Sequence, residues 1–297
     1  MRKFTALLLA FALVFCFAAC GGNGNTDTGA ETTDAPEAVP SGIEDGVLTV
    51  AMECAYAPYN WSQNDDSNGA VPIKGTNEFA NGYDVMTAKK ICEKYGWELE
   101  IVRLDWDSLV PAVQSGTVDA VIAGQSMTPD REEMVDFAGP YLYASIVCIA
   151  KKGSAYENAA SIKDLEGATC TSQMSTIWYD TCLEQIKDRV QVQEAAESAG
   201  AMLMALETGR VDFVCTDKPT AMGAMMAYDD MVMLDFEGSE DNFVVEESDI
   251  NIGISVMKGN TELKGLINDA LAGMTVDDFN AGIEAAAEIQ PLNDLVG

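Results

Sequence analysis

Few residues of this 297-residue chain could perform acid–base or nucleophilic chemistry. Histidine is absent, which excludes Ser-His-Asp and Cys-His nucleophiles in their familiar form and any zinc site built from histidine. The eight cysteines are widely spaced and include no Cys-x-x-Cys pair, so we expect no metal, no cofactor and no catalytic residue. Cys170 and Cys215 lie in predicted strands and could form a disulfide, but buried free thiols are an equal alternative.

Arg131 is the residue best suited to bind an anion. Thr128 is a good N-cap and Pro129 suits the first helical position, so Arg131 should rise from the first turn of a helix. Its planar guanidinium can hold a carboxylate through two parallel hydrogen bonds. The alternative is a surface arginine paired with Asp130 or Glu132.

An internal repeat places a second polar residue opposite this region. Residues 111–124 resemble residues 204–217, with identities at Ala112/Ala205, Gly116/Gly209, Val118/Val211, Asp119/Asp212 and Val121/Val214. Each copy is typical of a helix, a glycine stop, a tight turn and a buried strand. Ligands of open α/β sheets bind beyond the carboxyl ends of the strands, so Gly124 and Asp217 should face a shared cleft. Chance similarity of two common units is the alternative.

The surrounding pattern predicts an α/β fold. Strands are expected at 47–52, 97–104, 118–123 and 168–172, helices at 84–95 and 107–114, and a long hairpin or loop at 63–81. Strands alternating with helices indicate sheets covered on both faces. The apolar segments 141–151 and 249–258 bracket the second unit, so the chain should cross twice between two lobes. Such crossings allow closure of a two-lobed clamp around a ligand.

The N-terminus predicts export. Two positive residues precede an apolar run at 4–19, which is shorter than the roughly 20 residues of a membrane span and ends beside Cys20. This pattern resembles a bacterial lipobox, in which the cysteine is acylated; an ordinary signal peptide with an incidental cysteine is the alternative. We expect a signal peptide at 1–19, a lipidated Cys20 with a flexible tether at 20–45, lobe 1 at 46–145 plus 249–297, and lobe 2 at 146–248.

The formal net charge of −31 argues against binding to nucleic acid, because phosphates would be repelled. High solubility is the simplest reason for such a surface. A second consequence is attraction of cationic solutes into a cleft.

Three neighbouring segments carry a family resemblance. Residues 104–112 (Leu-Asp-Trp-Asp-Ser-Leu-Val-Pro-Ala), 124–131 (Gly-Gln-Ser-Met-Thr-Pro-Asp-Arg) and 135–141 (Val-Asp-Phe-Ala-Gly-Pro-Tyr) are similar to those of family 3 extracellular solute-binding proteins. The resemblance extends over about 47–258. It implies a type II periplasmic-binding-protein-like clamp that serves an importer of polar amino acids.

The resemblance also implies roles for individual residues. Arg131 would bind the α-carboxylate of the ligand, Asp217 would accept its ammonium group, and Ser126 with the Gly124 carbonyl would contact both. Backbone N–H groups near Ser175 and Thr176 would complete the carboxylate site, although the family usually has Gly-Thr there. The residues expected around the ligand's side chain are Glu53, Tyr56, Asp84, Trp106 and Gln173. Tyr56, Trp106 and Glu53 could instead belong to the core or to a solvated strand end.

The sequence therefore predicts a monomeric, lipid-anchored receptor outside the cytoplasm. It would capture a free polar amino acid, with Glu53 and the acidic surface favouring a cationic one, and pass it to the permease of an ABC importer. A sensory module or a dehydratase-like enzyme of the same fold are the alternatives.

Overall fold

The computed structural model of this protein describes residues 41–291. The predicted signal peptide, Cys20 and most of the predicted tether lie outside the described residues. The prediction that the tether continues to residue 45 is wrong, since Ser41 is only 4% exposed and its carbonyl accepts a hydrogen bond of 3.0 Å from the Asn260 amide. A buried backbone group held in this way belongs to the folded part of the chain.

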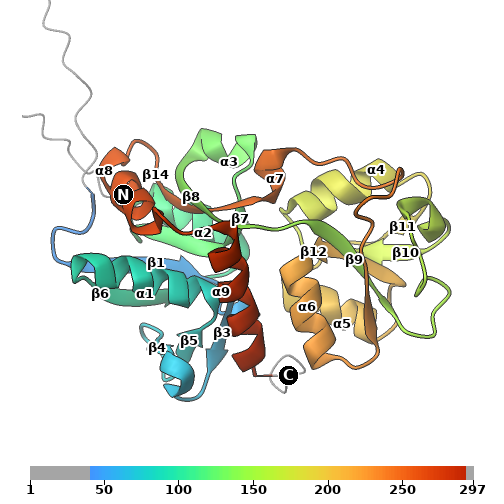
Figure 1. The fold of residues 1–297 in the computed structure, drawn as a ribbon, viewed down its shortest axis with the longest axis horizontal. Helices are drawn as coiled ribbons and strands as arrows, with labels where there is room; N and C mark the ends of the chain where they lie inside the picture. Colours follow the sequence, from blue (N-terminus) through green and yellow to red (C-terminus); the bar gives the residue numbers. More distant parts are fainter. Residues whose placement is uncertain (1–40, 292–297) are drawn as a thin grey trace, which may run out of the picture. The chain divides into compact units, whose positions relative to one another are not determined.

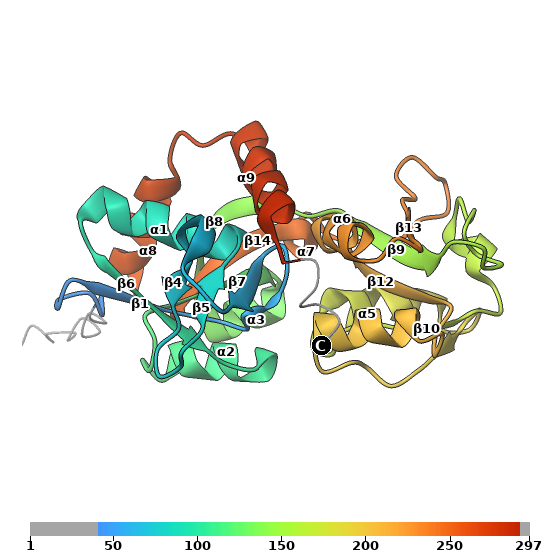
Figure 2. The same ribbon diagram turned by 90° about the horizontal axis from the view of Figure 1, so that it is seen from below.

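Lobe 1 is built on a five-stranded sheet in the order β6-β1-β7-β14-β8. Its strands are β1 (Val47–Met52), β6 (Glu98–Arg103), β7 (Ala120–Ser126), β8 (Val135–Tyr143) and β14 (Asn251–Met257). Its larger helices are α1 (Tyr83–Tyr95), α2 (Trp106–Gln114) and α8 (Thr261–Leu271). Figure 2 shows α1 and α8 on one face of this sheet and α2 on the other. All seven residues of β7 are buried, as expected for a central strand with both faces covered.

The polar stretch after β1 forms a small second sheet in lobe 1. Its order is β2-β3-β5-β4, from β2 (Ala55–Tyr56), β3 (Asn60–Gln63), β4 (Val71–Pro72) and β5 (Phe79–Asn81), with a 3₁₀ turn at Ser67–Gly69. The predicted hairpin or loop at 63–81 is therefore a loop that returns as antiparallel strands.

Lobe 2 contains the other five-stranded sheet, in the order β11-β10-β12-β9-β13. Its strands are β9 (Ile146–Lys151), β10 (Thr169–Thr171), β11 (Gln191–Val192), β12 (Phe213–Asp217) and β13 (Met231–Leu234). Its helical segments are η2 (Ile162–Leu165), η3 (Trp178–Leu183), α4 (Glu184–Ile186), α5 (Ala199–Glu207) and α6 (Lys218–Ala227). Helices α5 and α6 cover opposite faces of this sheet (Figure 2).

The chain crosses between the two sheets twice. It leaves the first sheet at the end of β8 and enters the second at β9, and it returns after β13 through the short helix α7 (Glu247–Ile250) into β14 (Figure 1). The last helix, α9 (Val276–Ile289), packs on α1 and β8 of lobe 1 and also on α6 of lobe 2. Two crossings and one bridging helix therefore connect the lobes.

The internal repeat predicted from the sequence corresponds to α2 with β7 and α5 with β12. Gly116 and Gly209 both adopt left-handed φ angles, of 71° and 70°, in the turn after the helix. Asp119 and Asp212 each accept a hydrogen bond from the neighbouring strand, at 2.8 Å from β1 and at 2.7 Å from β10. The same turn thus starts both strands and directs their carboxyl ends toward the ligand edge of each sheet.

Within residues 41–291, all six cysteines are buried free thiols, so Cys170 and Cys215 take the free-thiol alternative. This part of the chain contains no cluster of three or more histidine, cysteine or acidic side chains arranged to hold a metal. Nor does any helix between residues 41 and 291 have the length and apolar character needed to cross a membrane.

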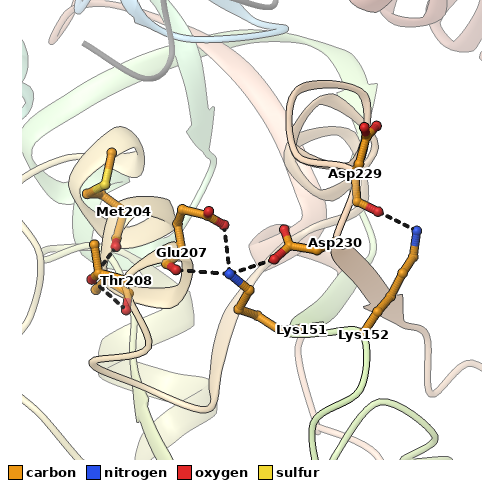
Figure 3. A network of polar contacts seen from close by, with 8 residues as sticks. Lys151, Lys152, Met204, Glu207, Thr208, Asp229 and Asp230 are labelled. Atoms are coloured by element: carbon orange, nitrogen blue, oxygen red, sulfur yellow. Dashed lines mark hydrogen bonds and ion pairs between the residues drawn. The ribbon is translucent and has the colours of Figure 1, made fainter.

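A network around Lys151 connects three elements of lobe 2 (Figure 3). The ammonium group at the end of β9 lies 2.6 Å from Asp230 Oδ2 and 3.0 Å from Glu207 Oε2, and it also donates to the Glu207 carbonyl at 2.9 Å. These hydrogen bonds raise the pKa of Lys151 and lower that of Asp230. One partly buried cation therefore ties β9 to the end of α5 and to the turn before β13.

We expect Lys151→Met to lower the free energy of unfolding by about 1 kcal/mol, because it removes a shared cation from a network. Lys74→Met, which breaks one exposed pair with Glu100, is the control and should change it by less than about 0.5 kcal/mol. Urea denaturation measures both. Because the pKa of Asp230 is lowered in the folded state, the Lys151 effect should be complete above about pH 4 and shrink at lower pH. Equal losses in the two variants would contradict a special role for Lys151.

Candidate functional site

Seven of the eleven predicted ligand-binding residues line one small cavity between the two lobes, and Glu53, Asp84, Ser175 and Asp217 do not. Its volume is about 10 Å³, close to the roughly 10–15 Å³ of probe-sized space that a single water molecule needs. We call it the central cavity, and its lining consists of Tyr56, Trp106, Gly124, Ser126, Arg131, Gln173, Thr176, Ile177 and Trp178. Binding of a molecule as large as an amino acid therefore requires the lobes or these side chains to move apart.

Arg131 rises from the first turn of α3 (Pro129–Met134), as predicted. Thr128 caps the helix by accepting the Arg131 N–H, and Pro129 occupies its start. The guanidinium donates to the Ser126 carbonyl of lobe 1 and to the Ser175 carbonyl of lobe 2, each at 2.9 Å. Burial lowers the pKa of Arg131 to about 10, which leaves it charged at neutral pH. Its two arms thus donate to one oxygen from each lobe, and the same two donors can hold the two oxygens of a carboxylate.

Trp106 fixes one side of this guanidinium. The Arg131 guanidinium carbon lies 5.2 Å from the centre of the indole ring, within the range of a cation–π contact. The indole N–H also donates to the Ser175 carbonyl at 3.4 Å. Trp106 is 9% exposed, so the aromatic ring belongs to the cavity wall as well as to the lobe 1 core.

Ser175 adopts a left-handed backbone conformation with φ of 55°. Such a conformation is uncommon outside glycine, asparagine and aspartate, so glycine would adopt it with less strain than serine. It turns the Ser175 carbonyl toward Arg131 just before η3 begins. The Thr176 hydroxyl donates to the Gln173 carbonyl at 2.7 Å, so its side chain supports the turn from within lobe 2.

Asp217 ends β12 and caps α6 by accepting the Thr220 N–H at 2.9 Å. It is 2% exposed, and its other oxygen accepts hydrogen bonds from two lobe 1 hydroxyls, those of Tyr59 at 2.8 Å and Tyr56 at 3.2 Å. Burial raises its pKa, whereas the hydrogen bonds from Thr220 and the two tyrosines act to lower it. Asp217 therefore faces lobe 1, as the repeat predicted, and two tyrosine hydroxyls already contact it there.

The rings of Tyr56 and Tyr59 are stacked, with centroids 4.6 Å apart, and lie against the backbone of Gly124. A Cβ atom on Gly124 would lie 2.8 Å from the Tyr56 ring and 3.1 Å from the Tyr59 ring. Gly124 also adopts a φ of 64°. Glycine is thus needed at the end of β7 both for its conformation and for the close approach of these rings.

Glu53 and Gln173 form an incompletely paired polar contact across the lobes. Glu53 is 7% exposed and Gln173 is 1% exposed, yet Glu53 Oε2 and Gln173 Nε2 both lack a hydrogen bond of normal geometry. Burial raises the pKa of Glu53 to about 8, opposed by the Gln173 amide and reinforced by the charges of Asp105, Asp84 and Asp107. A buried polar atom without a partner is costly, so this position favours a ligand group that would complete the pairing.

The expected contact of Asp84 with a ligand is wrong. Asp84 is fully buried inside lobe 1, where Tyr141 donates to one oxygen at 2.6 Å and Asn60 to the other at 2.7 Å. Burial raises its pKa to about 7. The two partners of Asp84 also contact the backbone of the site. The Tyr141 hydroxyl accepts a hydrogen bond from the Gly124 N–H, and the Asn60 amide oxygen accepts one from the N–H of Cys54, which follows Glu53. Asp84 therefore supports two site strands from behind.

Three residues at the site were not predicted from the sequence. Ile177 and Trp178 line the central cavity from lobe 2, with the Trp178 ring 6.3 Å from that of Tyr56. Tyr59 holds Asp217 without lining the cavity. Trp178 could have been predicted from its position, because it follows Ser175 and Thr176 closely and begins the helical segment.

A larger outer cavity of about 610 Å³ shares Trp106, Arg131, Thr176 and Ile177 with the central cavity. Four carboxylates line it: Asp107, Asp130, Asp180 and Asp249. Because their field is attractive to cations, a positively charged solute is favoured along this approach. The site thus combines carboxylates that attract a cationic group with the Arg131 guanidinium, which can bind an anionic one.

The chain matches the model of the "Bacterial extracellular solute-binding proteins, family 3" over residues 48–285. It is 27% identical over 233 residues to the "Arginine-binding extracellular protein ArtP" of Bacillus subtilis, which covers 78% of this chain and 79% of that protein. It is also 27% identical over 237 residues to the "L-cystine-binding protein TcyJ" of Escherichia coli, covering 79% of each.

A solved structure is also similar. It is an amino acid ABC transporter substrate-binding protein, AbpA, from Streptococcus pneumoniae bound to L-arginine. The two chains are 25% identical with a TM-score of 0.67, and the match covers 83% of this chain and 98% of the other.

We expect Gly124→Ala to lower the free energy of unfolding by at least about 1 kcal/mol more than Gly209→Ala does. Both glycines have nearly the same left-handed φ, but a Cβ on Gly209 would meet no atom within 4 Å. The difference thus isolates the collision with Tyr56 and Tyr59 from the backbone strain. Urea denaturation of the two variants measures it, and equal losses would mean that the tyrosine pair can shift freely.

Proposed function

Because the chain belongs to the bacterial extracellular solute-binding proteins of family 3, we propose that it binds a free amino acid outside the cytoplasm and presents it to the permease of an ABC importer. The observation that carries this proposal is that Arg131 of lobe 1 lines the central cavity, while Asp217 of lobe 2 accepts a hydrogen bond from Tyr56, which lines the same cavity. An amino acid has a carboxylate and an ammonium group on one carbon, and it needs an opposed cation and anion.

The contacts of Arg131 indicate how the carboxylate would bind. Its guanidinium donates to the Ser126 and Ser175 carbonyls, and a carboxylate is a stronger acceptor than a carbonyl oxygen. The first N–H groups of the helical segment after Ser175 lack carbonyl partners one turn earlier, so they can add donors. Three or four charged hydrogen bonds of roughly 1.5–3 kcal/mol each, with aromatic burial, suffice for about −8 kcal/mol, a micromolar affinity.

The ammonium group of the ligand would bind Asp217. Tyr56 lines the central cavity and makes the longer of the two tyrosine contacts with Asp217, at 3.2 Å against 2.8 Å for Tyr59. The ligand would therefore displace the Tyr56 hydroxyl and leave its ring as a wall of the site. Tyr56, Trp106 and Trp178 would then enclose the ligand's side chain.

A cationic side chain fits this site best. Glu53 has an unpaired buried oxygen at the end of β1, and the four carboxylates of the outer cavity favour a cation on its way in. The arginine-binding relatives agree with this class, whereas the cystine-binding relative shows that similar chains take other polar amino acids.

The remaining parts of the proposal concern attachment and organisation. Cys20 would carry lipid, with residues 20–40 as the main tether, and two acyl chains would anchor the protein stably. Lobe 1 would comprise residues 46–145 together with 249–297, and lobe 2 residues 146–248. The protein would act as a monomer, and acyl-chain mass spectrometry of the N-terminal peptide tests the anchor.

A dehydratase-like enzyme is the second candidate, because a buried carboxyl with a pKa near 8, such as Glu53, could donate a proton at neutral pH. The binding-protein reading requires that the bound compound be released unchanged. Incubation of the protein with each amino acid that it binds, followed by quantitative recovery of that compound, decides between the two functions.

We expect Arg131→Ala to weaken binding of every bound amino acid by at least about tenfold, because it removes a bidentate contact to the carboxylate. Arg103→Ala is the control, since Arg103 pairs with Glu78 at 2.7 Å on the surface of lobe 1. Calorimetry with arginine, lysine, histidine and glutamine measures both variants. Unchanged affinity in Arg131→Ala would show that another group holds the carboxylate.

Binding of arginine at pH 7 should release close to one proton more than binding of glutamine does. The pKa of Glu53 is raised to about 8, so below that pH the carboxyl carries a proton that a cationic ligand must expel. Arginine affinity should accordingly rise with pH up to about 8 and then level off. Calorimetry in two buffers of different ionisation enthalpy measures the proton number.

Glu53→Gln is the matched variant for this test. It should abolish the difference in proton release between arginine and glutamine and reduce arginine affinity by about tenfold or more. Asp84, whose pKa is near 7, contributes equally with both ligands and cancels in the comparison. Equal proton release with both ligands would contradict a direct contact between Glu53 and the side chain.

A further inference from the structure

Helix α6 of lobe 2 contacts lobe 1 at a surface apart from the central cavity. Tyr56, which lines the cavity, contacts Asp217 and Thr220 of α6. Three further lobe 1 residues, Pro58, Tyr59 and Gln290, contact α6 without lining the cavity. They meet α6 at two places, its N-cap Asp217 and its middle at Gly223. We call this set of contacts the α6 docking surface.

The first contact is the hydrogen bond from the Tyr59 hydroxyl to Asp217 at 2.8 Å. Tyr59 is fully buried, and its ring lies against Tyr56 on one side and near Gly124. Since Tyr59 stands behind Tyr56 as seen from the cavity lining, a ligand can reach Asp217 without displacing the Tyr59 hydroxyl. This bond therefore connects the lobes whether or not the cavity holds a ligand.

The second contact is formed where α6 lacks a side chain. A Cβ atom on Gly223 would lie 3.0 Å from Pro58 Cδ, 3.1 Å from Gln290 Oε1 and 3.5 Å from the carbonyl oxygen of Ala57. Gln290, which follows α9, donates to the Gly223 carbonyl at 3.0 Å. Glycine in a helix interior is unfavourable by roughly 1 kcal/mol, so a close approach of another segment is the physical reason for it here.

We propose that the α6 docking surface closes the two lobes independently of the amino acid, so that Tyr59 and Gly223 set how much of the protein is closed before ligand binds. This inference concerns the regulation of the same site and rests on the proposed function. A ligand shifts the equilibrium only by its differential affinity for the closed form, and the docking surface adds a fixed amount to that equilibrium for every ligand. It therefore tunes affinity without selecting among amino acids.

Two variants test the proposal on the full chain. Tyr59→Phe keeps the ring and removes the hydrogen bond to Asp217, and Gly223→Val places methyl groups against Pro58 and Gln290. Each has a matched control. Tyr83→Phe removes a buried tyrosine hydroxyl that donates within lobe 1, to the Tyr141 carbonyl, and Gly265→Val changes a helical glycine with no atom within 4 Å of its Cβ position.

The first measurement is small-angle X-ray scattering after bound ligand has been removed by unfolding and refolding. Both test variants should have a larger radius of gyration than the wild type, and both controls should match the wild type. Melting temperature and circular dichroism show whether each variant is folded. Folded test variants with wild-type scattering would overturn the proposal.

The second measurement is the dissociation rate of arginine and of glutamine by stopped-flow fluorescence. Tyr59→Phe should speed dissociation of both ligands by about the same factor, near tenfold, as expected for loss of a buried hydrogen bond to a charged group. A change for only one ligand would instead make Tyr59 a selectivity residue and overturn the proposal. Scattering needs no ligand, so failure of any amino acid to bind would count against the proposed function alone.

Discussion

Burial of charged groups between two lobes is the constraint on which the rest of this structure depends. Arg131, Asp217 and Glu53 all lie where closure removes water, and a buried charge without a partner is costly. Arg131 and Asp217 meet the constraint with oxygens and hydroxyls of the opposite lobe. Because neither lobe supplies these partners alone, the polar groups of the site make the two lobes energetically dependent on each other.

The sequence allowed prediction of those parts that depend on local signals. Thr128 and Pro129 specify the start of a helix, so the position of Arg131 followed, and the repeated turn around Gly116 and Gly209 placed Asp217 at the end of the matching strand. Both are short-range effects, of capping and of a glycine in a left-handed turn. They suffice to bring the ends of two distant strands to a common site.

The other parts depend on which way side chains point in the folded chain. Asp84 carries the charge that would suit a cationic ligand. It lies at the start of α1, however, and its side chain points into lobe 1, where Tyr141 and Asn60 donate hydrogen bonds to its two oxygens. Tyr59 looks like a core residue from sequence, and only the packing of α6 brings Asp217 to its hydroxyl. No local pattern encodes such tertiary contacts.

The site also divides its polar groups by how completely the protein itself pairs them. Both oxygens of Asp84 accept hydrogen bonds, and Asp217 accepts one from Tyr59. These bonds fix the positions of the ends of β1 and β7 and of the start of α6. Glu53 Oε2 and Gln173 Nε2 are left without partners in the same buried region. Groups that the protein already pairs are held rigidly and can bind the carboxylate and ammonium that all amino acids share. A group without a partner is stabilised most by a ligand whose side chain forms the missing hydrogen bond. We therefore expect selectivity to depend on Glu53, because the protein's own contacts leave one of its buried oxygens without a partner.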